Sequence, residues 1–123
     1  MTQDEFVAAT IEDARKAWGL DEQWKFTWEY RTDKKEYCEI DPTYFHEKRA
    51  LIKLDPGIDN PERLRRDIYH EVGHAVVFPI WLAASDWADH QIKGKKMRAI
   101  WDEMVNTSEN AVIDHIVCQV LKI

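Results

Sequence analysis

Two histidines and a glutamate in the segment His70-Glu71-Val72-Gly73-His74 have the residue types and the spacing of a metal-dependent hydrolase site. On a helix, residues four apart lie on one face with Cβ atoms roughly 5–6 Å apart, so both imidazoles can bind one ion. Glu71 lies beside them, where it can reach a water molecule on that ion. This HExxH pattern is typical of zinc hydrolases, in which the histidines are ligands and the glutamate is the general base. The sequence therefore predicts Zn²⁺ bound by His70 and His74, with Glu71 as the catalytic residue.

Glu109 is the favoured third ligand, because it interrupts an otherwise apolar pattern. From Lys95 onward, apolar residues recur at helical spacing as far as Val120, and Glu109 falls on this stripe. Burying an ionised carboxylate without a partner costs several kcal/mol or more, so Glu109 needs a cation, and a metal ion would serve. A salt bridge to lysine or arginine is the alternative explanation of this residue.

Other metal-binding side chains compete with Glu109 for the third position. His90, in the segment after the motif, is the main rival, and it could instead donate a hydrogen bond that stabilises the transition state. Asp114 and His115 lie off the Glu109 stripe, on opposite sides of it, at 100° per residue. His46 precedes a strand and has no helical partner, so we interpret it as structural.

The N-terminal half is expected to contain one helix and three strands. Thr2 and Glu5 fit a capping box at the start of an amphipathic helix that ends at Gly19. Residues 24–31 alternate aromatic and polar side chains, which is the period of a half-buried strand. Residues 36–40 are expected to return as a second strand and to form a hairpin with the first. Residues 50–54 then form a third strand, which stops at the turn signal Asp55-Pro56-Gly57.

The motif lies on a helix with clear start signals. Asn60 is a suitable N-cap and Pro61 a suitable first residue, while Phe78-Pro79 is expected to end the helix. Residues 80–94 are expected to form a short helix and a loop, and a long terminal helix then begins at Lys95, with an interruption near residues 106–108. Together these elements predict an α+β fold in one domain over residues 1–123.

Composition excludes several classes of protein. With 123 residues the chain is long enough for one modest core. A formal charge of −6 argues against a general nucleic-acid binder, which needs a basic surface. No apolar stretch approaches the roughly 20 residues that span a bilayer, and the acidic N-terminus does not match a secretory signal, so we expect a cytoplasmic protein. Cys38 and Cys118 have no zinc-ligand spacing and are expected to be reduced, with Cys118 in the core.

Beyond the motif itself, the chain resembles the small single-domain zinc metallopeptidases of phages and bacteria, which are related to the minigluzincins and more distantly to the thermolysin-like gluzincins. The resemblance extends over nearly the whole length, through the segments WKFTWEY, ALIKLDP, HEVGH and SENAVIDHIV. It implies a zincin-like domain with an N-terminal helix, a sheet of three or more strands, the HExxH helix and a long C-terminal helix. It also implies that His70 and His74 bind zinc, that Glu71 is the general base and that Glu109 is the third ligand.

Comparison with three related families makes the resemblance more specific. Metzincins carry a glycine and a third histidine where this chain has Val77 and Ile80, so that clan is excluded. SprT-like proteins have a downstream histidine that His90 could match. Thermolysin-like gluzincins place an aspartate four residues after the glutamate ligand, where this chain has Ile113.

These observations lead to two hypotheses of function. The first is hydrolysis of peptide bonds in a peptide or protein substrate, by water that occupies the open fourth position of the zinc and is activated by Glu71. The strand at residues 50–54 could offer an edge to which an extended peptide adds. The second is a non-catalytic or latent zinc-binding domain that acts through a protein or nucleoprotein partner.

Overall fold

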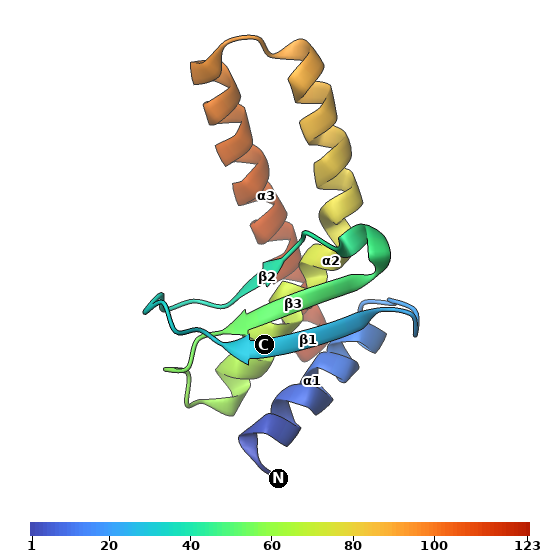
Figure 1. Cartoon of the computed structure of the whole chain (residues 1–123), viewed down its shortest axis with the longest axis vertical. Helices are drawn as coiled ribbons and strands as arrows, with labels where there is room; N and C mark the ends of the chain where they lie inside the picture. Colours follow the sequence, from blue (N-terminus) through green and yellow to red (C-terminus); the bar gives the residue numbers. More distant parts are fainter. The chain divides into compact units, whose positions relative to one another are not determined.

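Three α-helices and a three-stranded mixed sheet make up the computed structural model, which describes residues 1–123 and confirms the α+β class. The elements in chain order are α1 (Gln3–Ala17), β1 (Lys25–Tyr30), β2 (Glu39–Asp41), a 3₁₀ helix η1 (Phe45–Glu47), β3 (Arg49–Leu54), α2 (Pro61–Gln91) and α3 (Lys95–Leu121) (Figure 1). The chain forms two compact units, Met1–Val76 and Val77–Ile123, which are described separately. None of the helices combines the length and the apolar character needed to cross a lipid bilayer.

Helix α1 begins and ends as the sequence predicts. The hydroxyl of Thr2 accepts a hydrogen bond from the Glu5 N–H at 3.1 Å, which satisfies one of the free donors of the first turn. Gly19 follows the helix with φ of 77°, a left-handed conformation that glycine adopts without steric cost. The helix buries Val7, Ile11 and Ala14 in the first unit.

The strand order β1-β3-β2 places β3 in the centre of the sheet. Strand β1 pairs with β3 in parallel, from Lys25 beside Arg49 to Tyr30 beside Leu54, and β2 pairs with β3 in antiparallel orientation. The predicted hairpin between the first two strands is therefore wrong, as is the predicted role of residues 50–54 as an edge. The physical reason is burial, because Ile52 and Leu54 are fully buried, and a central strand is covered on both flanks.

A buried arginine holds the segment between β1 and β2 in place of a hairpin turn. Arg31 forms ion pairs with Asp33 at 2.9 Å and Glu39 at 3.0 Å, and its guanidinium lies 4.7 Å from the ring centroid of Tyr37. These contacts stabilise a wide connection that carries the chain past β3 to the far edge of the sheet.

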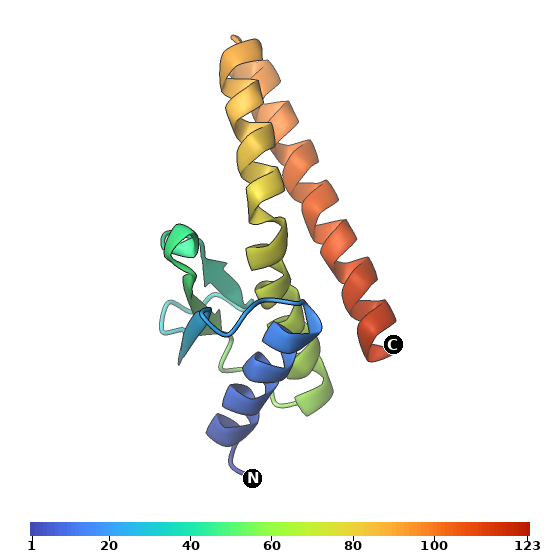
Figure 2. The same ribbon diagram turned by 90° about the vertical axis from the view of Figure 1, so that its right-hand side faces the viewer.

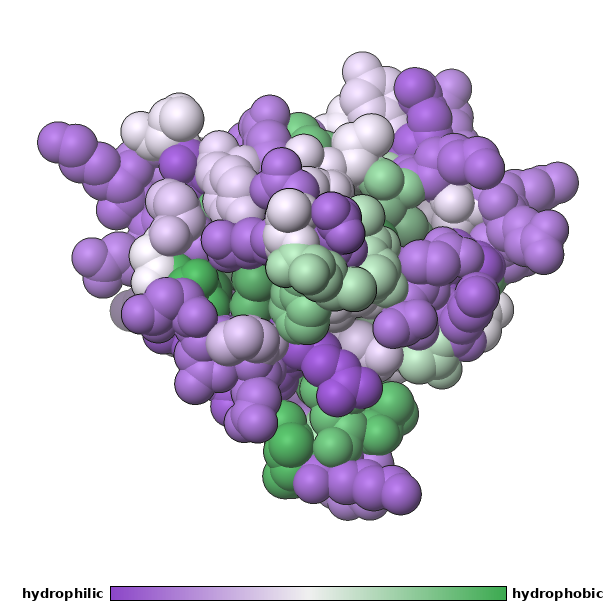
Figure 3. Space-filling model, turned by 90° about the horizontal axis from the view of Figure 1, so that it is seen from below, coloured by the Kyte–Doolittle hydropathy of each residue, from purple (hydrophilic) through white to green (hydrophobic).

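The core of the first unit joins the sheet to α1 and the first part of α2. Ile52, Ile68 and Val72 are fully buried, and the indole N–H of Trp18 donates to the Tyr69 carbonyl at 2.9 Å. This bond ties the end of α1 to the residue that precedes the motif. On the face seen from below, hydrophilic side chains cover most of the visible surface, with smaller hydrophobic patches among them (Figure 3).

Helix α2 starts where the sequence predicts but does not end there. The side-chain Oδ1 of Asn60 accepts hydrogen bonds from the Glu62 and Arg63 N–H groups at 2.9 and 3.3 Å, and Pro61 is the first residue. The predicted end at Pro79 is wrong, because the helix continues to Gln91. An interior proline costs about 3 kcal/mol. Apolar packing around it offsets this cost. The stacked rings of Phe78 and Trp81 have centroids 5.7 Å apart, and Ala88, further along the helix, is fully buried.

In the second unit, residues 77–91 of α2 and helix α3 lie side by side and antiparallel, as a helical hairpin (Figures 1 and 2). The rings of Trp87 and Trp101 lie 6.2 Å apart, and Arg98 of α3 forms ion pairs with Asp89 of α2 and Asp102 of its own helix. Residues 80–94 do form helix and then a loop at 92–94, but the helical part continues α2 to Gln91 and is not a separate short helix. The interruption expected near residues 106–108 is wrong, because α3 is continuous through them. Cys118 is half-buried rather than a core residue, and both cysteines are free thiols.

Candidate metal centre

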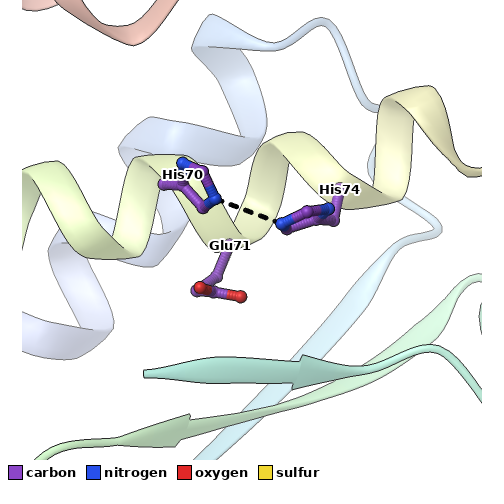
Figure 4. Close-up of side chains that lie close together, drawn as sticks. All are labelled: His70, Glu71 and His74. Atoms are coloured by element: carbon purple, nitrogen blue, oxygen red, sulfur yellow. Dashed lines mark hydrogen bonds between the residues drawn. The ribbon is translucent and has the colours of Figure 1, made fainter. Parts of the chain in front are cut away.

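His70 and His74 project from one face of α2 toward each other (Figure 4). Their Nε2 atoms lie 3.2 Å apart, and their ring centroids are 4.9 Å apart with the planes at 73°. Both side chains are half-buried. The spacing of four residues therefore brings two imidazole nitrogens close enough to bind one ion, as the sequence predicts.

The separation of these two nitrogens fits a shared metal ion. Zinc binds imidazole nitrogen at about 2.0–2.1 Å in a tetrahedral arrangement, which places two such nitrogens about 3.3 Å apart. The observed 3.2 Å is close to that value. In the metal-free chain one imidazole N–H can donate to the other ring nitrogen at this distance. An ion bound here would replace that proton with little movement of either ring.

Glu71 completes the group of potential ligands in the first unit. One ligand atom each from His70, Glu71 and His74 lie within 4.8 Å of one another. The Glu71 side chain is 8% exposed and points from α2 toward the strands (Figure 4). Its carboxylate accepts a hydrogen bond from the Ile40 N–H of β2. A carboxyl oxygen, two imidazoles and a strand edge thus meet in one place.

Burial raises the pKa of Glu71 to about 8, with the negative charges of Asp67 and Glu39 adding to the effect. The hydrogen bond from Ile40 and the positive charge of Arg31 act in the opposite direction. In the metal-free chain this carboxyl therefore keeps its proton at neutral pH. A divalent cation beside it would favour the ionised form, so metal binding and proton loss from Glu71 are linked.

Strand β2 is an edge strand, and the hydrogen bond to Glu71 lies on its outer side. Antiparallel pairs alternate between hydrogen-bonded and non-hydrogen-bonded residues. Because the Ile40 N–H is donated to Glu71, the pair of Ile40 with Ile52 is the non-hydrogen-bonded kind. Sequence reasoning missed this contact, since only the strand order reveals that β2 is the edge beside α2.

The remaining predicted site residues lie outside this group. Glu109 belongs to the second unit, where it lines a groove of the hairpin, so its role as third ligand stays a prediction. His90 is exposed on α2 of the same unit, and its Nδ1 donates to the Asp86 carbonyl at 2.9 Å; this bond and the Asp86 charge raise its pKa. His115 lies exposed on α3, and His46 lies exposed on η1.

No protein-family model matches this chain, and the comparisons with curated proteins and with solved structures gave no match either. The function is therefore inferred from the chemistry of the residues themselves.

Proposed function

We propose that this protein is a zinc-dependent metallopeptidase of the gluzincin type, with a zincin-like arrangement of its helices and sheet. The observation that carries the proposal is the 3.2 Å separation of the two imidazole nitrogens, with a buried glutamate between their positions in the sequence. Accidental histidines on a helix surface do not require a neighbouring carboxyl that is buried and held by a strand.

His70, His74 and Glu109 would hold the zinc ion. Two neutral imidazoles and one carboxylate form a donor set that zinc accepts, with a fourth position left open for catalysis. When bound, zinc supplies a Lewis acid that polarises the scissile carbonyl and makes water more acidic. His90 is the alternative third donor, and replacing each residue separately distinguishes them.

Glu71 would carry the protons of the reaction. As water attacks the carbonyl carbon, one of the Glu71 oxygens takes its proton; the new bond joins that carbon to the water oxygen. The carboxyl then gives the proton to the leaving amine as the carbon–nitrogen bond breaks. The hydrogen bond from the Ile40 N–H would hold the carboxyl in position through both transfers.

The outer edge of β2 is where an extended substrate would lie. An extended peptide along this edge would run beside the Glu71 carboxyl, because Ile40 contacts that carboxyl from the same edge. Since the Ile40 N–H is already donated to Glu71, the peptide would donate to the Ile40 carbonyl. This mode of binding selects extended or unfolded chains, since a compact protein does not present a free strand.

The proposal is tested by metal content and proteolysis in four variants. The Glu71→Gln variant should retain zinc and lose cleavage of an unfolded protein substrate, whereas His74→Ala should lose both. Glu109→Ala should weaken zinc binding, and His90→Ala should not. Unchanged cleavage by Glu71→Gln would refute the proposal. Zinc that stabilises the wild-type chain without cleavage of any peptide in a broad library would favour the non-catalytic alternative.

A further inference from the structure

Exposed apolar side chains are concentrated in the second unit. Thirteen large apolar residues of the chain are exposed, and ten of them lie within the 47 residues from Val77 to Ile123. Monomeric soluble proteins rarely leave large contiguous apolar patches uncovered, and such patches mark interaction surfaces. The ten are Ile80, Trp81, Leu82, Trp87, Met97, Ile100, Met104, Val112, Val120 and Ile123.

Most of these residues share one face of the hairpin. A groove of about 360 Å³ runs between the helices, and its lining is mainly apolar, from Ile80 and Trp81 of α2 to Met104 and Val112 of α3. On α3, Met97, Ile100 and Met104 are separated by three and four residues, so their side chains lie on one side of the helix. On α2, Trp87 follows Ile80 by seven residues and lies on the same side as Ile80. We name this surface the apolar face; it consists of Ile80, Trp81, Trp87, Met97, Ile100, Met104 and Val112.

The apolar face has enough area for a stable interface. The exposed fractions of its residues lie between 37% and 73%. At roughly 150–250 Å² for a large side chain, they leave on the order of 700 Å² of apolar surface. A standard interface buries about 800 Å² per partner, of which little more than half is apolar. The face therefore supplies the apolar part of a standard interface without any other element.

The order of residues along α3 makes the face complementary to itself. Large side chains at Met97, Ile100 and Met104 occupy the first half of the stripe, and the small residues Ser108 and Ala111 occupy the second half. When a second helix runs in the opposite direction, large residues meet small ones, which is the condition for close packing. A partner with an evenly bulky surface would not fit both halves.

Charged residues also lie beside the apolar stripe of α3. Lys96 and Asp114 lie eighteen residues apart, which is five full helical turns, so they occupy one side of the apolar stripe on α3. In an antiparallel pair that crosses near Met104, Lys96 of one copy lies opposite Asp114 of the other. Symmetry produces this pairing twice. Glu103 lies on the same side and faces its own copy near the crossing point, so this one contact opposes the pairing.

We propose that the apolar face of the α2–α3 hairpin binds the same face of a second copy of this chain, as a two-fold dimer in which the α3 helices run antiparallel and cross near Met104. In this arrangement Ile100 packs opposite Ser108, and Met97 packs opposite Ala111. The interface is isologous, so one surface serves both partners and the assembly closes at two copies.

The oligomeric state of the full chain tests the proposal. Sedimentation over a range of concentrations should show a dimer for the wild type and a monomer for Met104→Glu, because the substitution places two carboxylates at the two-fold axis. Asn106→Glu is the matched control, since Asn106 is exposed on the opposite side of the same helix; it should remain dimeric. A wild-type chain that is monomeric at every concentration would overturn the proposal, as would a Met104→Glu dimer as tight as the wild-type one.

Cross-linking tests the geometry in a second way, without a disruptive charge. With Cys118 replaced by serine, Met104→Cys should form a disulfide-linked dimer under mild oxidation, and Asn106→Cys should not. Disulfides require Cα atoms within about 7 Å, so only residues near the two-fold axis can form one. Equal cross-linking at both positions, or none at Met104→Cys, would contradict the proposed crossing point.

Discussion

Replacing Glu71 with glutamine should stabilise the metal-free protein at neutral pH, although the change removes the proposed catalytic group. The pKa of this buried carboxyl is about 8, against 4.5 for the ordinary side chain. At pH 7 the unfolded chain would carry the ionised form and the folded chain the protonated form. Each pH unit between 4.5 and 7 lowers the free energy of unfolding by about 1.4 kcal/mol. At pH 7 the protein is therefore about 3 kcal/mol less stable than it would be if the pKa of Glu71 were unshifted.

The raised pKa of Glu71 also determines how the stability of the protein changes with pH. A raised carboxyl pKa means that the folded chain binds more protons than the unfolded chain between pH 4.5 and pH 8. Stability from this group is therefore complete below pH 4.5 and declines as the pH rises towards 8. Glutamine is neutral throughout and can still accept the Ile40 hydrogen bond. The advantage of Glu71→Gln should thus be near zero at pH 4 and about 3 kcal/mol at pH 7.

Urea denaturation with a chelator present, at several pH values, measures this difference. Glu29→Gln on β1 is the control, because Glu29 is exposed and its replacement should change stability by no more than about 0.5 kcal/mol. Equal stabilities of wild type and Glu71→Gln at pH 7 would refute the reasoning, and so would an advantage that does not vary with pH. Either result would mean that the carboxyl is hydrated in solution.

Three further predictions concern the metal, the helix contact and the core. Zinc binding at pH 7 should release more protons from wild type than from Glu71→Gln, as measured by calorimetry in buffers of different ionisation enthalpy; equal release would contradict the link between the metal and Glu71. Trp18→Phe should destabilise the fold by about 1 kcal/mol in urea, because it removes the bond to the Tyr69 carbonyl; no loss would show that water replaces it. Ile52→Ala should cost about 2–5 kcal/mol and Ile52→Val about 0.5–1.5 kcal/mol, because the side chain is fully buried; similar values for both would exclude cavity formation as the cause.

Local features of this protein were predictable because their causes lie within a few residues. The cap formed by Thr2, the start of α2 at Pro61 and the end of α1 at Gly19 depend on neighbouring backbone groups, and the structure confirms all three. The meeting of His70 and His74 is local too, since a spacing of four on a helix brings the side chains together whatever surrounds them.

Two predictions failed where packing against distant residues outweighed a local signal. Pro79 is a strong helix breaker in isolation, but packing of the helix beyond it against α3, including the rings of Trp87 and Trp101, outweighs the lost hydrogen bond. The hairpin expected between the first strands gave way to parallel pairing of β1 with β3, because the fully buried β3 residues require a central position.

By itself, the sequence determined the motif, its helix and the identity of two potential metal ligands, since each follows from spacing along one segment. Only the tertiary structure decided which strand forms the edge beside Glu71 and how deeply that carboxyl is buried. Both depend on contacts between residues more than thirty positions apart, such as Ile40 and Glu71. Strand order and burial are properties of the whole packed unit, and no local pattern encodes them.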